Sequence, residues 1–311
     1  SAYTIFYMGV NVGSFLAPLV CGYFGETGNP HDFRWGFLIA AIVTVLTVVL
    51  FETQKNKYLI GPDGKPLGII PDAHKERPQA DNTARKSAHA NGRPMRNYLL
   101  LVLLAIALAG FFYWCFGSDW ISIGIFTACI VFPVSILLEG SLTKTERDRI
   151  FVIYIIAFFV IFFWAAYEQA GASLTLFASE QTDRSIFGWE MPASWFQSFN
   201  PLFVVILAYI MPGIWGFLNK RNMEPASPTK QAIGLLLLSL GYLFICFGVK
   251  DAIPGVKVSM IWLTGLYFIH TMGEIALSPI GLSMVNKLSP LRFASLMMGI
   301  WYLSTATANK F

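Results

Sequence analysis

The sequence has little charge. Only 13% of its 311 residues are Asp, Glu, Lys or Arg, whereas about 25% is usual for a soluble domain. Hydrophobic residues make up 55% and aromatic residues 15% of the chain. The net charge is +4, but the basic residues lie in connections between apolar runs, where they act as topology signals. The composition therefore predicts a membrane protein and disfavours nucleic acid as a partner.

Cysteine is scarce and follows no pairing pattern. The four cysteines lie inside apolar segments at unrelated spacings, without a CxxC pair or a neighbouring His: Cys21, Cys115, Cys129 and Cys246. This pattern argues against a disulfide framework and against a Cys/His metal site. The first residues also show no cleavable signal peptide, since they lack a basic n-region and a small-residue cleavage site. We expect buried free thiols, no bound cofactor or metal, and a chain cut from a longer protein.

Nine apolar runs are long enough to be membrane-spanning helices, for which about 20 residues are needed. Their approximate bounds are Thr4–Phe24, Trp35–Phe51, Asn97–Phe116, Trp120–Leu138, Ile150–Ala178, Ser194–Leu218, Lys230–Val249, Val258–Asn286 and Phe293–Asn309. A polar segment rich in Lys, Arg, Asp, Pro and Gly separates the second run from the third. The predicted parts are therefore a helix pair at 1–51, a linker at 52–96, a helix hairpin at 97–140 and a further bundle at 141–311.

The basic residues predict the orientation of these helices. If the chain starts in the cytoplasm, seventeen of the 22 Lys and Arg residues fall in cytoplasmic connections. The outer connections hold four, which are Arg34, Arg184, Lys250 and Lys257, and the remaining one, Lys310, stands at the end of the sequence. Adding or removing one helix would destroy this bias, so the positive-inside rule supports both the nine helices and a cytoplasmic linker at 52–96.

A few ionisable and polar side chains lie inside the apolar runs. A charged group at the bilayer centre costs about 2.5–3.5 kcal/mol on insertion scales, so its presence suggests a function. Glu168 lies in the outer half of its run and Glu274 near the centre of another. The alternative is a carboxylate held by polar neighbours for packing alone. His270 stands one turn before Glu274, as a proton relay or as a tolerated polar neighbour.

Four stretches carry a family resemblance. The stretch from Phe6 to Leu19 resembles the signature of the proton-coupled oligopeptide transporter family at its fifth transmembrane helix. The uncharged hairpin at 97–140 is similar to the extra helix pair of bacterial members. Three more stretches are similar to the family's seventh, eighth and tenth helices, in that order: Phe163-Trp164-Ala165-Ala166-Tyr167-Glu168-Gln169, Trp195-Phe196-Gln197-Ser198-Phe199-Asn200-Pro201 and Gly273-Glu274-Ile275-Ala276-Leu277-Ser278-Pro279.

The resemblance implies an all-α polytopic membrane protein with an incomplete major facilitator fold. The chain would hold helices five to eleven and the inserted pair. Helices one to four and twelve, with the first-helix ExxER motif, would be missing. The implied function is symport of di- and tripeptides with protons by alternating access, in a bacterial inner membrane and as a monomer. Protons would be the coupling ion.

The resemblance also assigns roles to single residues. Glu274 would lie near the amino terminus of the peptide, and Asn200 would hydrogen-bond its backbone. Glu168 would couple proton movement, through a salt bridge to a first-helix arginine that protonation breaks. The implied substrate-binding residues are Tyr7, Asn11, Trp164, Asn200, Glu274, Ser278 and Trp301.

Three alternatives stay open on the sequence. The same architecture could carry another small solute, such as nitrate, a drug or an amino-acid conjugate. A membrane-embedded enzyme is disfavoured, because the chain shows no HExxH motif, no paired aspartates at a helix end and no Ser with a base. A non-transporting subunit or channel would explain the uncharged hairpin, whereas the carboxylates inside the runs favour a transporter.

Overall fold

The computed structural model describes residues 2–60, 95–250 and 255–310. Internal contacts divide the chain into two units, Ser1–Pro18 with Arg93–Phe311, and Leu19–Gly92. Each unit has its own packing, and Glu168, Asn200 and Glu274 all belong to the larger one.

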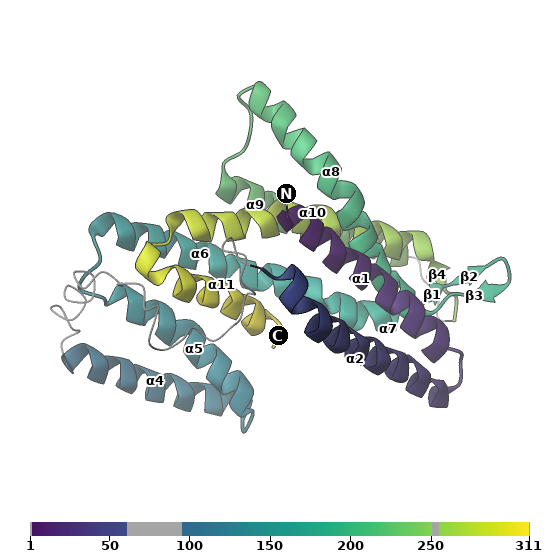
Figure 1. The fold of residues 1–311 in the computed structure, drawn as a ribbon, viewed down its shortest axis with the longest axis horizontal. Helices are drawn as coiled ribbons and strands as arrows, with labels where there is room; N and C mark the ends of the chain where they lie inside the picture. Colours follow the sequence, from purple (N-terminus) through teal and green to yellow (C-terminus); the bar gives the residue numbers. More distant parts are fainter. Residues whose placement is uncertain (1, 61–94, 251–254, 311) are drawn as a thin grey trace. The chain divides into compact units, whose positions relative to one another are not determined.

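Each of the nine apolar runs contains one long α-helix in the described part of the chain (Figure 1). These helices are α1 (Ala2–Gly25), α2 (Phe33–Tyr58), α4 (Met95–Phe116), α5 (Trp120–Leu137), α6 (Lys144–Tyr167), α8 (Phe199–Lys220), α9 (Ser227–Val249), α10 (Met260–Leu288) and α11 (Ala294–Ala308). The remaining elements are short: η1 (Pro30–Asp32), η2 (Glu168–Gly171), α7 (Ser173–Glu180), η3 (Ala193–Ser198), η4 (Leu291–Phe293), β1 (Thr182–Asp183), β2 (Ser185–Ile186), β3 (Trp189–Glu190) and β4 (Val258–Ser259).

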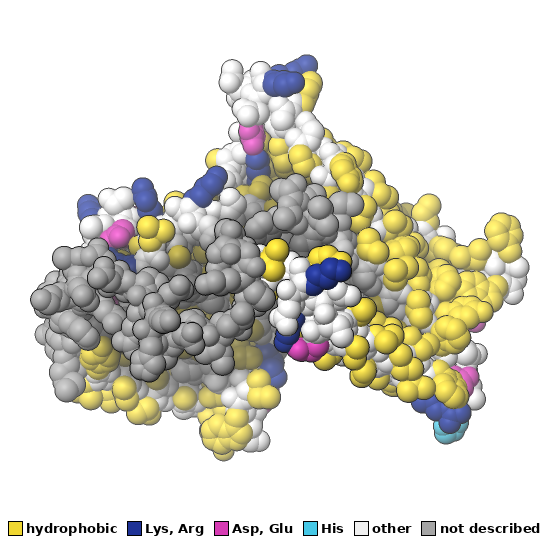
Figure 2. Space-filling model, in the orientation of Figure 1, with side chains coloured by type: hydrophobic (Ala, Val, Ile, Leu, Met, Phe, Trp, Pro, Cys, Tyr) yellow, Lys and Arg dark blue, Asp and Glu magenta, His cyan; other side chains and the backbone are white. Residues whose placement is uncertain are grey.

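The surface of these helices suits a lipid environment. Among the described residues, seven helices are long and apolar enough to cross a membrane. Figure 2 shows hydrophobic side chains along the sides of the helices and charged ones gathered near their ends. Large side chains such as Phe37 (74% exposed) and Trp114 (82% exposed) would be unfavourable in water. The predicted fold class, an all-α polytopic membrane protein, is confirmed.

Residues 19–60 form a helical hairpin with a close crossing. A Cβ atom on Gly36 would lie 2.9 Å from the carbonyl oxygen of Cys21, and one on Gly25 would lie 3.6 Å from the Cα of Gly36. Glycine is therefore needed at Gly36 for the two helices to approach this closely.

The second helix of this hairpin is longer than the sequence predicts. α2 ends at Tyr58, beyond the predicted end at Phe51. The extra turns are polar and include an ion pair of 2.5 Å between Lys55 and Glu52, a spacing that stabilises an isolated helix. Residues 61–94 of the predicted linker lie outside the described residues.

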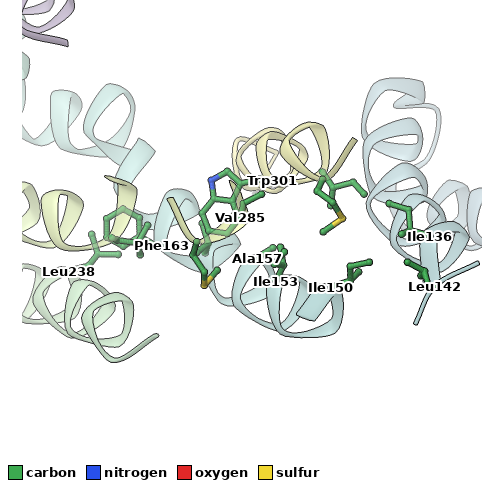
Figure 3. Close-up of a cluster of buried hydrophobic side chains, with 14 residues drawn as sticks. Ile136, Leu142, Ile150, Ile153, Ala157, Phe163, Leu238, Val285 and Trp301 are labelled. Atoms are coloured by element: carbon green, nitrogen blue, oxygen red, sulfur yellow. The ribbon is translucent and has the colours of Figure 1, made fainter. Parts of the chain in front are cut away.

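The main core of the larger unit lies between α5, α6, α9, α10 and α11 (Figure 3). Ile150, Phe163 and Val285 have no exposed surface in this core. α5 contributes the fully buried Ile136 and packs against α11, while most side chains of α4 are exposed. The predicted hairpin is thus anchored to the bundle through α5.

The closest helix pair is α9 with α10. A Cβ on Gly234 would lie 2.8 Å from the carbonyl oxygen of Gly273, and the reverse distance is also 2.8 Å. Seven residues further along α9, the ring of His270 fills the space beside Gly241, where a Cβ would lie 2.4 Å from it. Small residues let these two backbones touch, as is usual for helices packed within a membrane.

We expect Gly234→Ala to weaken this pair. The added methyl meets backbone on α10, so the helices must separate, at a cost of about 1–3 kcal/mol. Thermal unfolding of the full-length protein in detergent should show a Tm lower by several degrees. Gly216→Ala in α8 is the matched control, because a Cβ there has no neighbour within 4 Å among the described residues. Equal Tm values for the two variants would contradict the close crossing.

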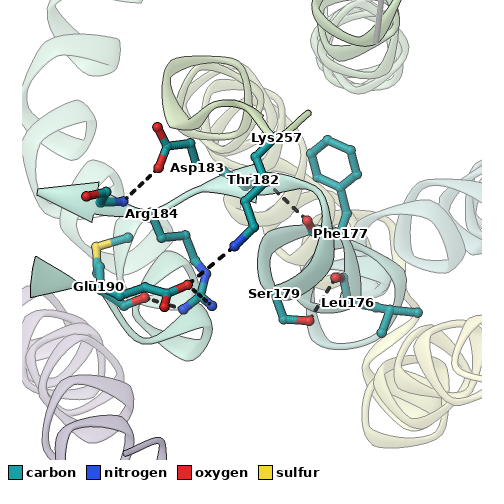
Figure 4. A network of polar contacts seen from close by, with 10 residues as sticks. Leu176, Phe177, Ser179, Thr182, Asp183, Arg184, Glu190 and Lys257 are labelled. Atoms are coloured by element: carbon teal, nitrogen blue, oxygen red, sulfur yellow. Dashed lines mark hydrogen bonds and ion pairs between the residues drawn. The ribbon is translucent and has the colours of Figure 1, made fainter. Parts of the chain in front are cut away.

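A polar network ties together the loops at the end of the bundle that the sequence predicts to face outward (Figure 4). Arg184 Nη2 donates to Glu190 Oε1 at 2.8 Å, and Lys257 Nζ lies 3.5 Å from the same oxygen. β1 pairs with β4 in parallel, with Thr182 opposite Val258, and β2 pairs with β3 in antiparallel fashion. Two of the four cations on the predicted outer side therefore have an acidic partner.

Candidate functional site

The apolar run that contains Glu168 does not form one straight helix. α6 ends at Tyr167, the 3-10 helix η2 follows, and α7 begins after Ala172, whose φ of −120° and ψ of −96° are not helical. The sequence predicts a continuous run over Ile150–Ala178, and the structure divides it at Glu168.

Tyrosines from neighbouring helices satisfy the backbone at this division. The hydroxyl of Tyr242 in α9 donates to the carbonyl oxygen of Ala166 at 2.6 Å. The hydroxyl of Tyr267 in α10 donates to the carbonyl oxygen of Ala170 at 3.4 Å. Carbonyl groups at a helix end lack partners within their helix, and hydrocarbon supplies none, so these hydroxyls stabilise the division.

Four polar side chains meet next to the division, and we call them the polar cluster: Tyr167 of α6, Asn200 of α8, and Thr271 and Glu274 of α10. The Tyr167 hydroxyl donates to Glu274 Oε2 at 2.5 Å. Asn200 Nδ2 donates to the same oxygen at 2.8 Å and to Thr271 Oγ1 at 3.1 Å. It also donates to the Tyr167 hydroxyl. Three helices are thus joined by one carboxylate and one amide.

The hydrogen bonds explain how Glu274 is tolerated inside a span. A carboxylate at the bilayer centre costs about 2.5–3.5 kcal/mol, and each hydrogen bond to a charged group contributes about 1.5–3 kcal/mol. The two donors on Glu274 Oε2 therefore offset the cost of the charge. No described residue hydrogen-bonds to the other carboxylate oxygen, Oε1, in this structure.

α10 presents polar side chains along one face. Tyr267, Thr271, Glu274 and Ser278 recur at spacings of four, three and four residues, which place them in one stripe on a helix. The Ser278 hydroxyl is buried and has no hydrogen-bond partner among the described residues. The stripe extends the polar surface beyond the polar cluster in both directions along α10.

Of the site residues predicted from the sequence, the structure joins Asn200 and Glu274 directly. It adds Tyr167 and Thr271, which sequence reasoning missed. Thr271 could have been found from the polar stripe on α10, because it lies one turn before Glu274 on the same face. Tyr167 stands beside Glu168 in the quoted motif, but the sequence holds no sign that it contacts α10.

The two tryptophans predicted for the site lie in different surroundings. Trp164 is half-buried, and its ring meets that of Tyr167 edge-on at 5.4 Å. Trp301 is 4% exposed and packs over Gly281, where a Cβ would lie 2.4 Å from its ring. Trp301 therefore belongs to the core between α10 and α11, and its role as a pocket wall stays a prediction.

Glu168 adjoins the polar cluster along the chain but makes no hydrogen bond to its members in the described structure. It opens η2 directly after Tyr167, and its side chain is exposed. No hydrogen bond or ion pair joins it to another residue in the described ranges. The cation that the resemblance assigns to it would come from a first helix outside this chain, so its coupling role stays a prediction.

The predicted site residues of α1 are described in part. Asn11 is buried, with 8% of its surface exposed. The side chain of Tyr7 lies outside the described residues. Their assignment to the peptide pocket stays a prediction.

His270 packs between helices and makes no hydrogen bond to Glu274 among the described contacts, and a relay role for it stays untested. Its Nε2 lies 3.1 Å from the carbonyl oxygen of Leu238, so this nitrogen must carry the hydrogen and donate. The ring also contacts Tyr242, with centroids 4.8 Å apart. His270 thereby joins α9 to α10 behind the polar cluster. In the described part of the chain, no three His, Cys, Asp or Glu side chains gather closely enough to hold a metal ion.

A comparison with protein families decides what kind of chain this is. A family model described as the POT family matches residues 1–70 and 99–311. The chain belongs to the POT family. This match confirms the family resemblance that the sequence predicts.

Relatives of this POT family chain include named transporters. It is 30% identical over 318 residues to "Peptide transporter YePEPT" of Yersinia enterocolitica, with 99% of the chain and 59% of the relative covered. It is 33% identical over 309 residues to "Uncharacterized transporter YclF" of Bacillus subtilis, with the same coverage. The chain therefore spans 59% of the length of each of these relatives.

Solved structures of POT family members are similar to it as well. A crystal structure of the peptide transporter POT in complex with sulfate matches with a TM-score of 0.74 and 34% identity, covering 98% of this chain and 59% of the other. A mutant of the same transporter in complex with alafosfalin matches with a TM-score of 0.72 and 33% identity, covering 98% and 58%. A POT family transporter in complex with 5-aminolevulinic acid matches with a TM-score of 0.70 and 27% identity, covering 98% and 60%.

Proposed function

We propose that the full-length protein carries di- and tripeptides across the membrane together with protons. The observation that supports this most is Glu274, a carboxylate held within a membrane-spanning helix by two donors on Oε2. A fixed negative charge in this position suits a cationic group on the cargo, and the amino terminus is the cation that all unmodified peptides share. A charge-assisted hydrogen bond between them is about twice as strong as a neutral one.

Membership of the POT family supports the same proposal. One relative is named a peptide transporter, and one similar structure holds alafosfalin. Asn200 can offer its amide to a peptide backbone, and the unpartnered Ser278 hydroxyl lies on the same stripe as Glu274. The other proposed binding residues are Tyr7, Asn11, Trp164 and Trp301, and protons are the coupling ion.

We assign proton coupling to Glu168. Its carboxylate is exposed at the division between α6 and η2, so a cation on another helix can reach it. It stands next to Tyr167, which is bonded to Glu274. A change of protonation at Glu168 therefore acts one residue away from the polar cluster. We propose a monomer in a bacterial inner membrane, with residues 52–96 on the cytoplasmic side.

Uptake by proteoliposomes tests the proposal. The full-length protein is reconstituted, and radiolabelled Ala-Ala uptake is followed with the outside more acidic than the inside. We expect accumulation that a protonophore abolishes and that unlabelled di- and tripeptides inhibit. A protein that takes up no peptide under any gradient would contradict the proposal.

A second cargo has specific support, because a similar POT family structure holds 5-aminolevulinic acid. This compound carries one amino and one carboxyl group, as a peptide does, and suits the same carboxylate. Uptake of labelled 5-aminolevulinic acid that neither Ala-Ala nor tripeptides inhibit, with no uptake of Ala-Ala itself, would favour this cargo over peptides.

A further inference from the structure

Tyr167 makes the shorter of the two hydrogen bonds to Glu274, at 2.5 Å. The hydroxyl donates to Oε2, the same oxygen that accepts from Asn200 at 2.8 Å. A carboxylate oxygen offers two lone pairs, so these two donors occupy Oε2. The other oxygen, Oε1, receives no hydrogen bond from any residue that the structure describes.

The Tyr167 ring cannot easily move away from this position. Phe163, one turn earlier on α6, stacks on it with centroids 5.5 Å apart and planes 18° apart. Trp164 meets it edge-on at 5.4 Å, and His270 lies 6.2 Å away on the α10 side. Aromatic contacts of this kind favour a defined ring geometry. These contacts therefore hold the Tyr167 hydroxyl in one position relative to the Glu274 carboxylate.

We infer that Tyr167 is a positioning residue of the cargo site, which turns Glu274 so that Oε1 faces the cargo's ammonium group. Asn200 alone cannot do this, because its Nδ2 also donates to Thr271 and to the Tyr167 hydroxyl. Without the hydroxyl, the carboxylate keeps one shared donor and can rotate about its terminal torsion, which is broad in Glu. The inference rests on the proposed function, because it concerns cargo with a free amine.

The contrasting role is purely structural, with Tyr167 holding α6 to α10. Tyr242 provides the reference for such a role, since its hydroxyl supports the Ala166 carbonyl at 2.6 Å and does not reach Glu274 in this structure. The two roles differ in one observable. A positioning residue changes the preference for amine-bearing cargo, whereas a structural one changes stability or all cargoes alike.

The test compares Tyr167→Phe with wild type in counterflow exchange by the full-length protein in proteoliposomes. We expect the KM for Ala-Ala to rise about 10-fold, from loss of one hydrogen bond to a charged group, with the maximal rate within about twofold. Competition by propionyl-alanine, which has the same length as Ala-Ala but no amine, should be unchanged. The variant thus loses its preference for the amine.

Tyr154→Phe is the matched control on the same helix, because the only hydrogen bond of that hydroxyl among the described residues is to the Met297 sulfur, at 3.6 Å. It should keep the wild-type KM. An unchanged KM for Ala-Ala in Tyr167→Phe, or an equal loss for both compounds, would overturn the inference and leave peptide transport intact. A wild-type protein that exchanges no peptide would instead overturn the proposed function, and the inference with it.

Discussion

Glu274→Gln is expected to lower the affinity of the full-length protein for Ala-Ala by about 10- to 100-fold. The change keeps the shape of the side chain but removes the charge, so the cargo's ammonium loses a charge-assisted hydrogen bond worth about 1.5–3 kcal/mol. The amide must also turn its oxygen toward Tyr167 and Asn200, whose donors now meet Oε2. Its NH₂ group then points where Oε1 was and repels the ammonium. Calorimetric titration of the purified protein measures this effect.

The control for Glu274→Gln is Glu180→Gln, the same substitution at an exposed position at the end of α7. It should bind Ala-Ala as wild type does. Near-normal affinity in Glu274→Gln, in a protein with an unchanged Tm, would remove this carboxylate from the cargo site. The transport proposal would then lack its main physical support.

Glu168→Gln is expected to abolish accumulation of Ala-Ala driven by a proton gradient and to leave counterflow exchange. Glutamine cannot take up or release a proton, so residue 168 would stay uncharged throughout the transport cycle and could not couple transport to the proton gradient. The exchange step needs cargo binding but no net proton movement, and the polar cluster stays intact because Glu168 makes no hydrogen bond to it in the described structure. Paired uptake assays on one reconstitution measure both activities.

Gln169→Glu is the control for Glu168→Gln, because it changes the charge at the neighbouring residue and keeps the Glu168 carboxylate. Gln169, the next residue of η2, hydrogen-bonds Ser173 at 3.0 Å, and Gln169→Glu places a carboxylate beside Glu168 without removing it. This variant should still accumulate peptide. Gradient-driven accumulation by Glu168→Gln at the wild-type level would assign proton coupling to another group.

Much of the fold could be predicted from the sequence. The cost of placing each residue in hydrocarbon depends mainly on that residue and its depth, so apolar runs and basic connections indicate spans without any knowledge of neighbours. The nine long helices agree with these runs. The predicted end of the second helix was too early. The last turns of α2 are polar, and local ion pairs extend a helix beyond its apolar segment.

The site was predictable in part. Glu274 and Glu168 stand out because charge inside a span is rare, and the family resemblance added Asn200. Tyr167 was missed because a tyrosine in an apolar run is ordinary, and its hydroxyl gains a role only from the carboxylate that α10 brings to it. The division of α6 was missed because the residues around Glu168 include no proline that would mark it.

The sequence by itself determined the membrane environment, the helices and the family, because solvation acts on each segment separately. The tertiary structure decided which polar groups meet: the hydroxyl of Tyr167 on Glu274, the hydroxyl of Tyr242 on the end of α6, and the ring of His270 against Gly241. Hydrogen bonds need two partners at a set distance and angle. Packing three helices together supplies that second partner, which no single segment contains.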